Sequence, residues 1–241
     1  MSLRVLWLRP RRAVEALATE EAILRCRLEN GSPDTLCFWR GKKCVVVGYD
    51  RNRDKVNFQL CEELRVPIYR RHSGGGAIYQ DEGNLNYSLV AAQDGIALPT
   101  EVQYARRIVD SIVAEAISDL GLKAHAMDRG GVSVDGGKVS GSAQFVLWGY
   151  LLHHGVVAVN TNLNALSKLI LTNKIPVTTL ERELGRRIDV RKLATLIGAR
   201  LTAAFNTTTY RGRLTEKEKY VAQKLLEEKY LSHEWNGCSR A

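Results

Sequence analysis

The sequence has few cysteines, and their spacing argues against the structures that cysteines most often support. The five are Cys26, Cys37, Cys44, Cys61 and Cys238. No two of them form a C-x-x-C pair, which disfavours a zinc site, and an odd, scattered set disfavours a disulfide framework. We therefore interpret them as ordinary buried or surface thiols.

The sequence also lacks long apolar runs, internal repeats and low-complexity linkers. No stretch reaches the roughly 18 consecutive apolar residues of a membrane-spanning helix. The segment Met1 to Arg4 does not lead into the apolar stretch of a secretory signal, so we expect a cytoplasmic protein that does not enter a membrane. A chain of 241 residues can fold as one large domain with a sizeable core.

Basic residues outnumber acidic ones. The 35 Lys and Arg against 26 Asp and Glu give a net charge of +9. Such an excess fits nucleic acid, an anionic small ligand or an acidic protein partner, and a solvated basic surface is its simplest interpretation. The basic residues are spread along the chain, without a basic tail or an aromatic-interleaved RNA motif. We therefore do not expect nucleic-acid binding.

Helix and strand patterns alternate irregularly along the chain. Residues 13–28 are rich in Ala, Leu and Glu and predict a helix. Residues 45–47, ended by Gly48, and residues 155–159 predict buried strands. Apolar residues between positions 102 and 120 recur at helical spacing. The order lacks the regular rhythm of a doubly wound sheet, so we predict an α+β fold built on mixed β-sheets flanked by helices.

Three capping motifs predict where helices begin. Thr100 with Gln103 has the spacing of a capping box, and Thr215 with Glu218 has the same spacing before the last helix, at about 215–230. Asp189 can cap a helix that carries an apolar face as far as residue 205.

The first candidate site is the segment from Arg70 to Asn86, which contains three consecutive glycines at 74–76. Glycines allow positive φ, so successive N–H groups in such a loop can turn toward one anion. Arg70 and Arg71 before the loop can make bidentate contacts to phosphate or carboxylate. A triple glycine alone favours a flexible surface turn. Together with the arginines and the following Asp81-x-x-Asn84-x-Asn86, it predicts a functional anion loop.

Common phosphate-loop patterns do not account for this loop. A dinucleotide fingerprint that starts at Gly74 needs glycine where Tyr79 stands. A Walker loop that ends at Lys138 needs glycine and Ser or Thr where Val132 and Val139 stand. The sequence therefore predicts a different kind of anion loop.

The second candidate site surrounds Lys138. Asp135-Gly136-Gly137 reads as a hairpin turn, and Lys138 follows it among small residues, so a bulky ligand can approach the backbone closely. An ammonium at this position can stabilise negative charge that develops on a phosphoryl or carbonyl oxygen. By itself, the pattern also fits a solvated lysine just after a hairpin.

Together, the two segments resemble lipoate–protein ligases. Arg70-Arg71-x-Ser73-Gly74-Gly75-Gly76-Ala77, followed by Asp81-x-Gly83-Asn84, is similar to the signature of that family. Gly137-Lys138-Val139-Ser140-Gly141-Ser142-Ala143 is similar to its lysine loop, at the appropriate distance downstream. His153-His154-Gly155 resembles the entry to the next strand, and Glu234-Trp235-Asn236 resembles the end of the large domain. The resemblance covers nearly the whole chain.

The resemblance implies a fold and a chemistry. The implied fold is shared with biotin ligases and class II aminoacyl-tRNA synthetases, with mixed sheets flanked by helices around one ligand tunnel. The implied reaction joins lipoate to AMP at the expense of ATP, with Mg²⁺ assisting, and then transfers the lipoyl group to a lysine of a lipoyl domain. The implied acceptors are acyltransferase subunits of 2-oxoacid dehydrogenases and the glycine-cleavage carrier protein. The sequence does not distinguish lipoate from octanoate.

The resemblance also implies site residues. Lys138 would be the catalytic residue and would touch both the phosphate and the acyl carbonyl. The residues implied to bind the nucleotide or lipoyl-AMP are Arg70, Arg71, Ser73, Gly74, Gly75, Gly76, Ala77, Ile78, Tyr79, Asn84, Lys138, Ser142 and Ala143. Gln80 departs from the family, since many relatives have histidine there, and no metal ligands are identified. We interpret His72, His153 and His154 as structural.

Two other functions stay open beside the ligase. One is an ATP-independent lipoyl or octanoyl transferase on the same fold. Its cysteine-dependent forms are disfavoured, because no cysteine occurs between Cys61 and Cys238. The other is a non-catalytic binding module, which the presence of Lys138 and both arginines disfavours.

The end of the sequence leads to one more expectation. Many single-chain members of the family have an accessory C-terminal domain that helps adenylation. Here the chain stops at Ala241, five residues after Asn236. We therefore expect residues 1–241 to be the large catalytic domain alone, with a separate small protein supplying the accessory part.

Overall fold

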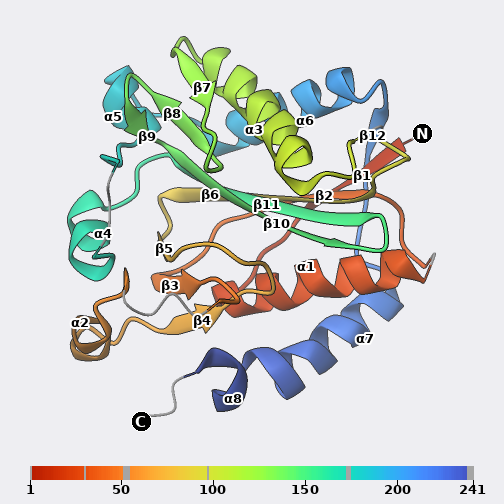
Figure 1. The fold of residues 1–241 in the computed structure, drawn as a ribbon, viewed down its shortest axis with the longest axis horizontal. Coiled ribbons are helices and arrows are strands. Elements are labelled where there is room, and N and C mark those ends of the chain that lie inside the picture. Colours follow the sequence, from red (N-terminus) through yellow and green to blue (C-terminus); the bar gives the residue numbers. More distant parts are fainter. Residues whose placement is uncertain (1, 30, 51–54, 97, 172–174, 238–241) are drawn as a thin grey trace.

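A mixed six-stranded sheet forms the centre of the computed structural model, which describes residues 2–29, 31–50, 55–96, 98–171 and 175–237 (Figure 1). The strand order is β10-β11-β6-β2-β1-β12, with β1 parallel to both neighbours and the other pairs antiparallel. The strands are β1 (Ser2–Trp7), β2 (Thr35–Trp39), β6 (Asn84–Ala92), β10 (Ser140–Leu147), β11 (Tyr150–Ala158) and β12 (Thr208–Arg211). Cys238 and the tail after it lie outside the described residues.

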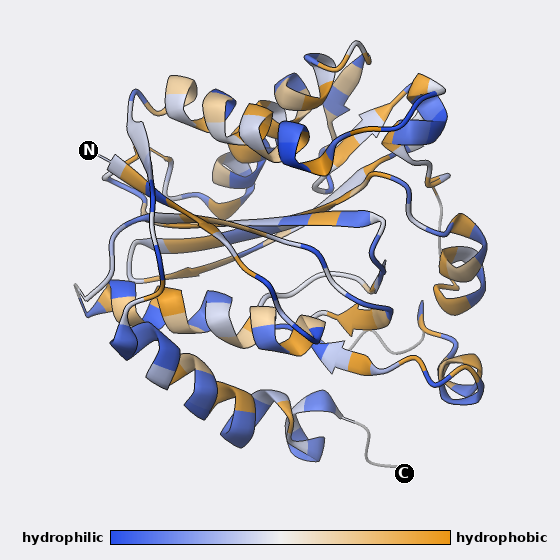
Figure 2. Ribbon diagram, turned by 180° about the vertical axis from the view of Figure 1, so that it is seen from behind, coloured by the Kyte–Doolittle hydropathy of each residue, from blue (hydrophilic) through white to orange (hydrophobic). Residues whose placement is uncertain are grey.

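Helices cover both faces of this sheet. On one face lie α3 (Val102–Ser118) and α6 (Val190–Ala204), and on the other lies α1 (Ala13–Leu28), with α7 (Glu216–Leu225) packed outside it (Figure 1). Figure 2 shows that hydrophilic residues predominate on α7, as its outer position requires. The α+β prediction, with mixed sheets flanked by helices, is confirmed.

Two small sheets flank one end of the central sheet and carry the two predicted site segments. One has the order β4-β3-β5 and the other β7-β8-β9. Their strands are β3 (Cys44–Val47), β4 (Ile68–Arg70), β5 (Ile78–Gln80), β7 (Ala124–Ala126), β8 (Val132–Val134) and β9 (Gly137–Lys138). The remaining elements are α2 (Phe58–Glu63), α4 (Leu163–Leu169), α5 (Leu180–Leu184), the π-helical turn Leu226–Tyr230 and α8 (His233–Asn236).

Two of the three capping predictions are confirmed. Asp189 accepts a hydrogen bond from the backbone N–H of Arg191, and Thr215 with Glu218 forms a complete capping box. The prediction of a capping box at Thr100 and Gln103 is wrong. Extended Glu101 is the N-cap of α3, without a side-chain bond, so the helix begins one residue later than the box requires.

The strand predicted at residues 155–159 is longer than expected. It begins at Tyr150, so His153 and His154 lie in the middle of β11 rather than at its entry. The strand predicted at 45–47 and the helix at 13–28 have the expected positions. The described helices include none with the length and apolar character needed to cross a bilayer.

Candidate functional site

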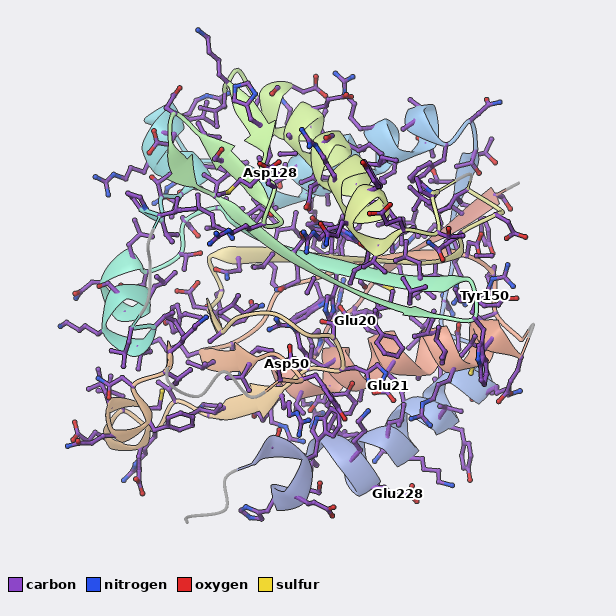
Figure 3. All side chains as sticks on the ribbon, in the orientation of Figure 1. Glu20, Glu21, Asp50, Asp128, Tyr150 and Glu228 are labelled. Atoms are coloured by element: carbon purple, nitrogen blue, oxygen red, sulfur yellow. The ribbon has the colours of Figure 1, made fainter. Side chains whose placement is uncertain are left out.

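The two predicted segments meet at a cavity of about 330 Å³ between the small sheets and the end of the central sheet. One wall consists of Arg71, the three glycines, Ala77 and Ile78, and the opposite wall consists of Lys138 and residues 141–144. α1 closes the cavity with Leu17 and Glu20. Figure 3 places Glu20 between α1 and the strands of the central sheet. Residues more than 60 positions apart therefore share one ligand-sized space.

A second, smaller cavity of about 130 Å³ adjoins the first. The two share Ala77, Ile78, Lys138, Gly141 and Val156. The side chains that line only the second cavity are Tyr79, Asn84, Val139, Ser140, Ala158, Thr161, Leu166, Ile170 and Val177. Lys138 therefore stands at the junction of two compartments, the smaller of which is mainly apolar.

The glycine loop, residues 71–77, is fixed to the end of β3. The N–H of Arg71 donates to the carbonyl of Val47, and the N–H of Tyr49 donates to the carbonyl of Ser73. Of the three glycines, Gly75 has a positive φ of 92°. Gly48 allows the close approach, because a Cβ there would lie 2.0 Å from the carbonyl oxygen of Gly75. The loop is thus held by backbone contacts rather than left as a flexible turn.

Arg71 points into the structure and lines the larger cavity. Its guanidinium donates to the carbonyl of Gly74 at 2.6 Å and to Oγ of Ser73 at 3.1 Å. Burial lowers the pKa of Arg71 to about 10, and nearby Asp50 opposes that change. The side chain therefore stays cationic at neutral pH and is available to an anion in the cavity.

Arg70 takes a different direction and does not line either cavity. Its guanidinium lies 4.4 Å from the ring centres of both Tyr49 and Trp235. Nη1 donates to the carbonyl of Trp235, and the backbone N–H of Arg70 donates to Oδ1 of Asn236. Its position indicates that Arg70 docks α8 onto β4, beside the loop, whereas Arg71 faces the ligand space.

A hydrogen-bonded chain runs along the cavity wall from Arg71 to α1. Oγ of Ser73 lies 2.6 Å from Nε2 of His154, whose Nδ1 lies 2.9 Å from Oε2 of Glu20. Nε1 of Trp39 donates to the other oxygen of Glu20. This order is that of a serine triad, which the sequence did not reveal. Ser73 is fully buried, however, so a substrate carbonyl cannot reach its hydroxyl, and the chain serves to fix the orientation of Arg71.

The hairpin predicted before Lys138 is confirmed. β8 and β9 pair through Val134 and Gly137, and Asp135 and Gly136 both have positive φ, as a two-residue turn of this type requires. The N–H of Lys138 donates to the carbonyl of Pro176 at 2.7 Å. Its backbone is therefore fixed on both sides, which limits where the ammonium can lie.

The ammonium of Lys138 is half-buried and hydrogen-bonded to the protein. Nζ donates to the carbonyl of Gly130 at 3.2 Å. Burial lowers the pKa of Lys138, the carboxylate of Asp110 raises it, and Arg106 lowers it. Arg106 and Arg129 line the same cavity, so with Arg71 four cationic side chains face one space.

The structure brings most of the predicted residues to the two cavities. Arg71, Gly74, Gly75, Gly76, Ala77, Ile78, Tyr79, Asn84, Lys138, Ser142 and Ala143 line one cavity or the other. Ser73 lies behind the wall, and Arg70 lies outside it. Gln80 lines the larger cavity and exchanges side-chain hydrogen bonds with Asn86, which explains how an amide fits at this position.

Several lining residues were missed from the sequence. Leu17, Glu20, Trp39, Arg106, Arg129 and His154 line the larger cavity. Among them, His154 was interpreted as structural, yet it contributes to the cavity wall. No short motif connects α1, β2, α3 and β11, so these side chains become recognisable as one site only after folding.

The chain belongs to the lipoyl protein ligase A/B catalytic domain family, whose model matches residues 12–202. Lipoate-protein ligase A subunit 1 of Thermoplasma acidophilum is 28% identical over 242 residues, covering 92% of this chain and 90% of that protein. Octanoyltransferase LipM of Clostridioides difficile is 26% identical over 254 residues, covering 91% and 93%. Lipoate-protein ligase LplJ of Bacillus subtilis is 26% identical over 218 residues, which are 83% of this chain but only 63% of LplJ.

Solved structures share the fold over almost the whole chain. A lipoate-protein ligase A bound with ATP has a TM-score of 0.87 and 25% identity, covering 98% of both chains. The putative lipoate protein ligase Ta0514 of T. acidophilum, with bound lipoic acid, has a TM-score of 0.87 and 24% identity, covering 98% of this chain and 99% of that one. A bi-partite lipoate protein ligase from the same organism has the same TM-score and identity, covering 100% and 98%. The chain is therefore an enzyme of the lipoate-protein ligase family.

Proposed function

We propose that this chain is the catalytic component of an ATP-dependent lipoate–protein ligase. The observation that carries the proposal is the cavity in which Arg71, Arg106, Arg129 and Lys138 stand near an apolar wall. An acyl-adenylate is an anion attached to an apolar chain, and a site for it needs cations and N–H donors beside an apolar channel. The relative that binds ATP, at 25% identity, supports the same proposal.

The two compartments suit the two halves of lipoyl-AMP. We propose that the smaller compartment, with Tyr79, Asn84 and Thr161 among aliphatic side chains, holds the adenosine. The lipoyl chain would lie in the larger cavity against Leu17 and Trp39. The phosphate and the acyl carbonyl then fall at the junction, where Lys138 stands.

In the first step, a lipoate carboxylate oxygen attacks the α-phosphorus of ATP, the bond to the bridging oxygen breaks, and pyrophosphate leaves. Arg71 and Lys138 would neutralise charge on the phosphate oxygens and fix their geometry. In the second step, a neutral lysine amine of the acceptor attacks the acyl carbonyl, an amide forms, the nitrogen loses a proton, and AMP leaves with the bonding electron pair. Lys138, as an ammonium, would stabilise the carbonyl oxyanion in that step.

Mg²⁺ is part of the proposal, and its ligands would come mainly from the nucleotide. Within the described ranges, no group of three His, Cys, Asp or Glu side chains is placed to hold a metal ion. Magnesium commonly uses one or two carboxylates together with substrate phosphates and water, so the phosphates of ATP fit this role. The ion would supply charge neutralisation on the phosphates.

Acyl transfer without ATP is the second candidate, because the LipM relative is an octanoyltransferase. A covalent route of that kind through cysteine needs a reactive thiolate. Cys26, Cys37, Cys44 and Cys61 are buried, and burial raises the pKa of each thiol, that of Cys44 to about 12. None of these four lines the candidate cavities. The ligase is therefore the better supported of the two.

Supplying the acyl group in two forms distinguishes the ATP-dependent ligase from the ATP-independent transferase. The purified chain is incubated with a lipoyl domain and either lipoate with Mg²⁺-ATP or octanoyl acyl carrier protein, and the mass of the acceptor is measured. We expect a lipoyl mass increase only when ATP and lipoate are present, with release of pyrophosphate. A mass increase from the carrier protein without ATP would instead establish the transferase.

The same assay tests the accessory partner. We propose that a separate small protein is needed for adenylation, because the chain is similar over 92% of its length to subunit 1 of a T. acidophilum ligase. Adding the second component of that bi-partite system should raise the rate of pyrophosphate release at least tenfold. Transfer from preformed lipoyl-AMP should be insensitive to it. Rapid pyrophosphate release by the chain alone would remove the two-component proposal and leave the ligase proposal standing.

The acceptors we propose are lipoyl domains of 2-oxoacid dehydrogenase acyltransferase subunits and the glycine-cleavage carrier protein. The net charge of +9 would speed encounter with an acidic acceptor domain. We also propose that the reaction takes place in the cytoplasm.

Arg71→Ala is expected to weaken binding of ATP by about 10- to 100-fold, because a buried charge-assisted contact contributes about 1.5–3 kcal/mol. Binding of lipoate alone should change less. Isothermal titration with each ligand measures both constants. Arg211→Ala, at an exposed position on β12, is the matched control and should leave both unchanged. If Arg71→Ala reduced only the affinity for lipoate, the assignment of the two compartments would be reversed.

A further inference from the structure

One peptide group connects a buried carboxylate to the catalytic lysine. Oδ2 of Asp110, on α3, accepts from the backbone N–H of Gly131 at 2.9 Å and from Oγ of Ser142 at 2.8 Å. The carbonyl of Gly130, which belongs to the same peptide group as that N–H, accepts from Nζ of Lys138 at 3.2 Å. In a trans peptide the N–H and C=O point in opposite directions. Asp110 therefore lies at one edge of this planar peptide group and the ammonium of Lys138 at the opposite edge.

The backbone conformation of this peptide depends on its two glycines. Gly130 and Gly131 have φ of 88° and 96°, a backbone region that residues with a side chain rarely adopt. A Cβ on Gly131 would also lie 2.0 Å from the carbonyl oxygen of Ser140, which leaves no space for one. Such a conformation persists where surrounding contacts determine it. Asp110 supplies one of those contacts through the N–H of Gly131. Its second hydrogen bond holds Ser142, whose hydroxyl oxygen would lie 3.1 Å from a Cβ on Gly130.

Asp110 itself is completely buried, and few charged or titratable side chains lie close to its carboxylate. The groups that face it are Lys138, Arg106 on its own helix, and the side chains of His153 and Tyr87 from the sheet. Nε2 of His153 lies 3.8 Å from Oδ1 of Asp110, and burial lowers the pKa of His153 to about 3, so the ring is neutral at physiological pH. Oδ1 has no hydrogen-bond partner among the described residues. The carboxylate is thus oriented toward the Gly131 side.

We propose that Asp110 is a positioning residue for Lys138: through the Gly130–Gly131 peptide it fixes and polarises the carbonyl that holds the lysine ammonium at the junction of the two compartments. A carboxylate on an N–H strengthens the hydrogen bond accepted by the carbonyl of the same peptide group. Asp110 also favours the charged form of Lys138 by its field. This proposal rests on one part of the proposed function, namely that Lys138 contacts the phosphate and the acyl carbonyl.

Three variants separate charge, hydrogen bonding and fold. Asp110→Asn keeps an oxygen that can accept from Gly131 and Ser142 but removes the charge. Ser142→Ala removes one hydrogen bond and keeps the charge. Asp119→Asn, on the exposed end of the same helix, makes the matched charge change away from the site. Thermal unfolding of each variant checks that the comparison is made between folded proteins.

The first measurement needs no enzymatic activity. The ligand-free proteins are treated with trace acetic anhydride at a series of pH values, and acetylation of Lys138 is compared by mass spectrometry with that of exposed Lys123. We expect Lys138 in Asp110→Asn to react about three- to tenfold more at pH 8 than in the wild type, because less of it is protonated. Asp119→Asn and Ser142→Ala should show at most a small change. An unchanged Lys138 profile in Asp110→Asn overturns the proposal.

The second measurement is the pH dependence of transfer from preformed lipoyl-AMP. An ammonium that must be charged is lost as pH rises through its pKa, so removal of Asp110 should bring the alkaline loss of activity to lower pH. We expect Asp110→Asn to lower the rate at least tenfold at pH 9 and less at pH 7. A uniform loss at every pH would indicate a purely structural role and contradict the proposal. If the wild type transferred nothing at any pH, the proposed function would fail, while the labelling result would still decide whether Asp110 acts on Lys138.

Discussion

Lys138→Ala is expected to lower both adenylation and lipoyl transfer about 100-fold or more, the scale of losing a preorganised group that stabilises transition-state charge. The effect should be large because Nζ stands where the two compartments meet. The midpoint of thermal unfolding should change little, since the side chain is half-buried and its backbone bonds to Pro176 and Thr178 do not depend on it. Single-turnover rates with and without preformed lipoyl-AMP measure the two steps separately.

Two further variants show whether the loss comes from the charge. Lys138→Met keeps most of the apolar stem and should be as inactive as Lys138→Ala. Lys123→Ala removes an exposed lysine that contributes to neither cavity and should retain full activity. A Lys138→Met variant with most of the wild-type rate would show that packing, and not charge, is what this position supplies.

The parts of the fold that could be predicted are those determined by local sequence. The helix at 13–28, the strand at 45–47 and the turn at 135–136 each follow from residues that are neighbours along the chain. The capping box at Thr100 was wrong because two alternative caps stand side by side. Glu101 is the N-cap although its side chain makes no capping hydrogen bond, so capping preferences alone do not predict this boundary.

The candidate site could be predicted where it consists of a continuous motif, and not where it depends on packing. Arg70 and Arg71 are neighbours with the same charge, yet one contacts Trp235 and the other faces the cavity. Successive residues of an extended segment point to opposite sides, but only the docking of α8 decides which side is which. Asp110 carries no motif at all. Its importance becomes visible only through the Gly131 N–H, 21 positions away.

Gly48→Ala is expected to lower the rate of adenylation strongly, although Gly48 is not part of the cavity walls. Gly48 lines neither cavity, but an added Cβ would lie 2.0 Å from the carbonyl oxygen of Gly75 and 2.9 Å from the carbonyl carbon of Gly74. These are backbone atoms, so β3 and the glycine loop must separate by an ångström or more. A displacement of that size can reduce a reaction rate about 100-fold. We expect a loss of that order in adenylation, measured as pyrophosphate release with lipoate and Mg²⁺-ATP in the presence of any required second component.

Gly198→Ala on α6 is the matched control for this change. Beyond the adjoining backbone of its own helix, the nearest atom to its added Cβ would be Cδ2 of Leu36 at 3.9 Å, and alanine in a helix interior is more stable than glycine by roughly 0.5–1 kcal/mol. It should therefore unfold at the same or a higher temperature and keep its activity. In Gly48→Ala, separation of the loop should also weaken ATP binding, because Arg71 is anchored to that loop through Gly74. Normal ATP affinity and a normal rate in Gly48→Ala would mean that the glycine loop can move without loss, and that its close packing on β3 does not form the site.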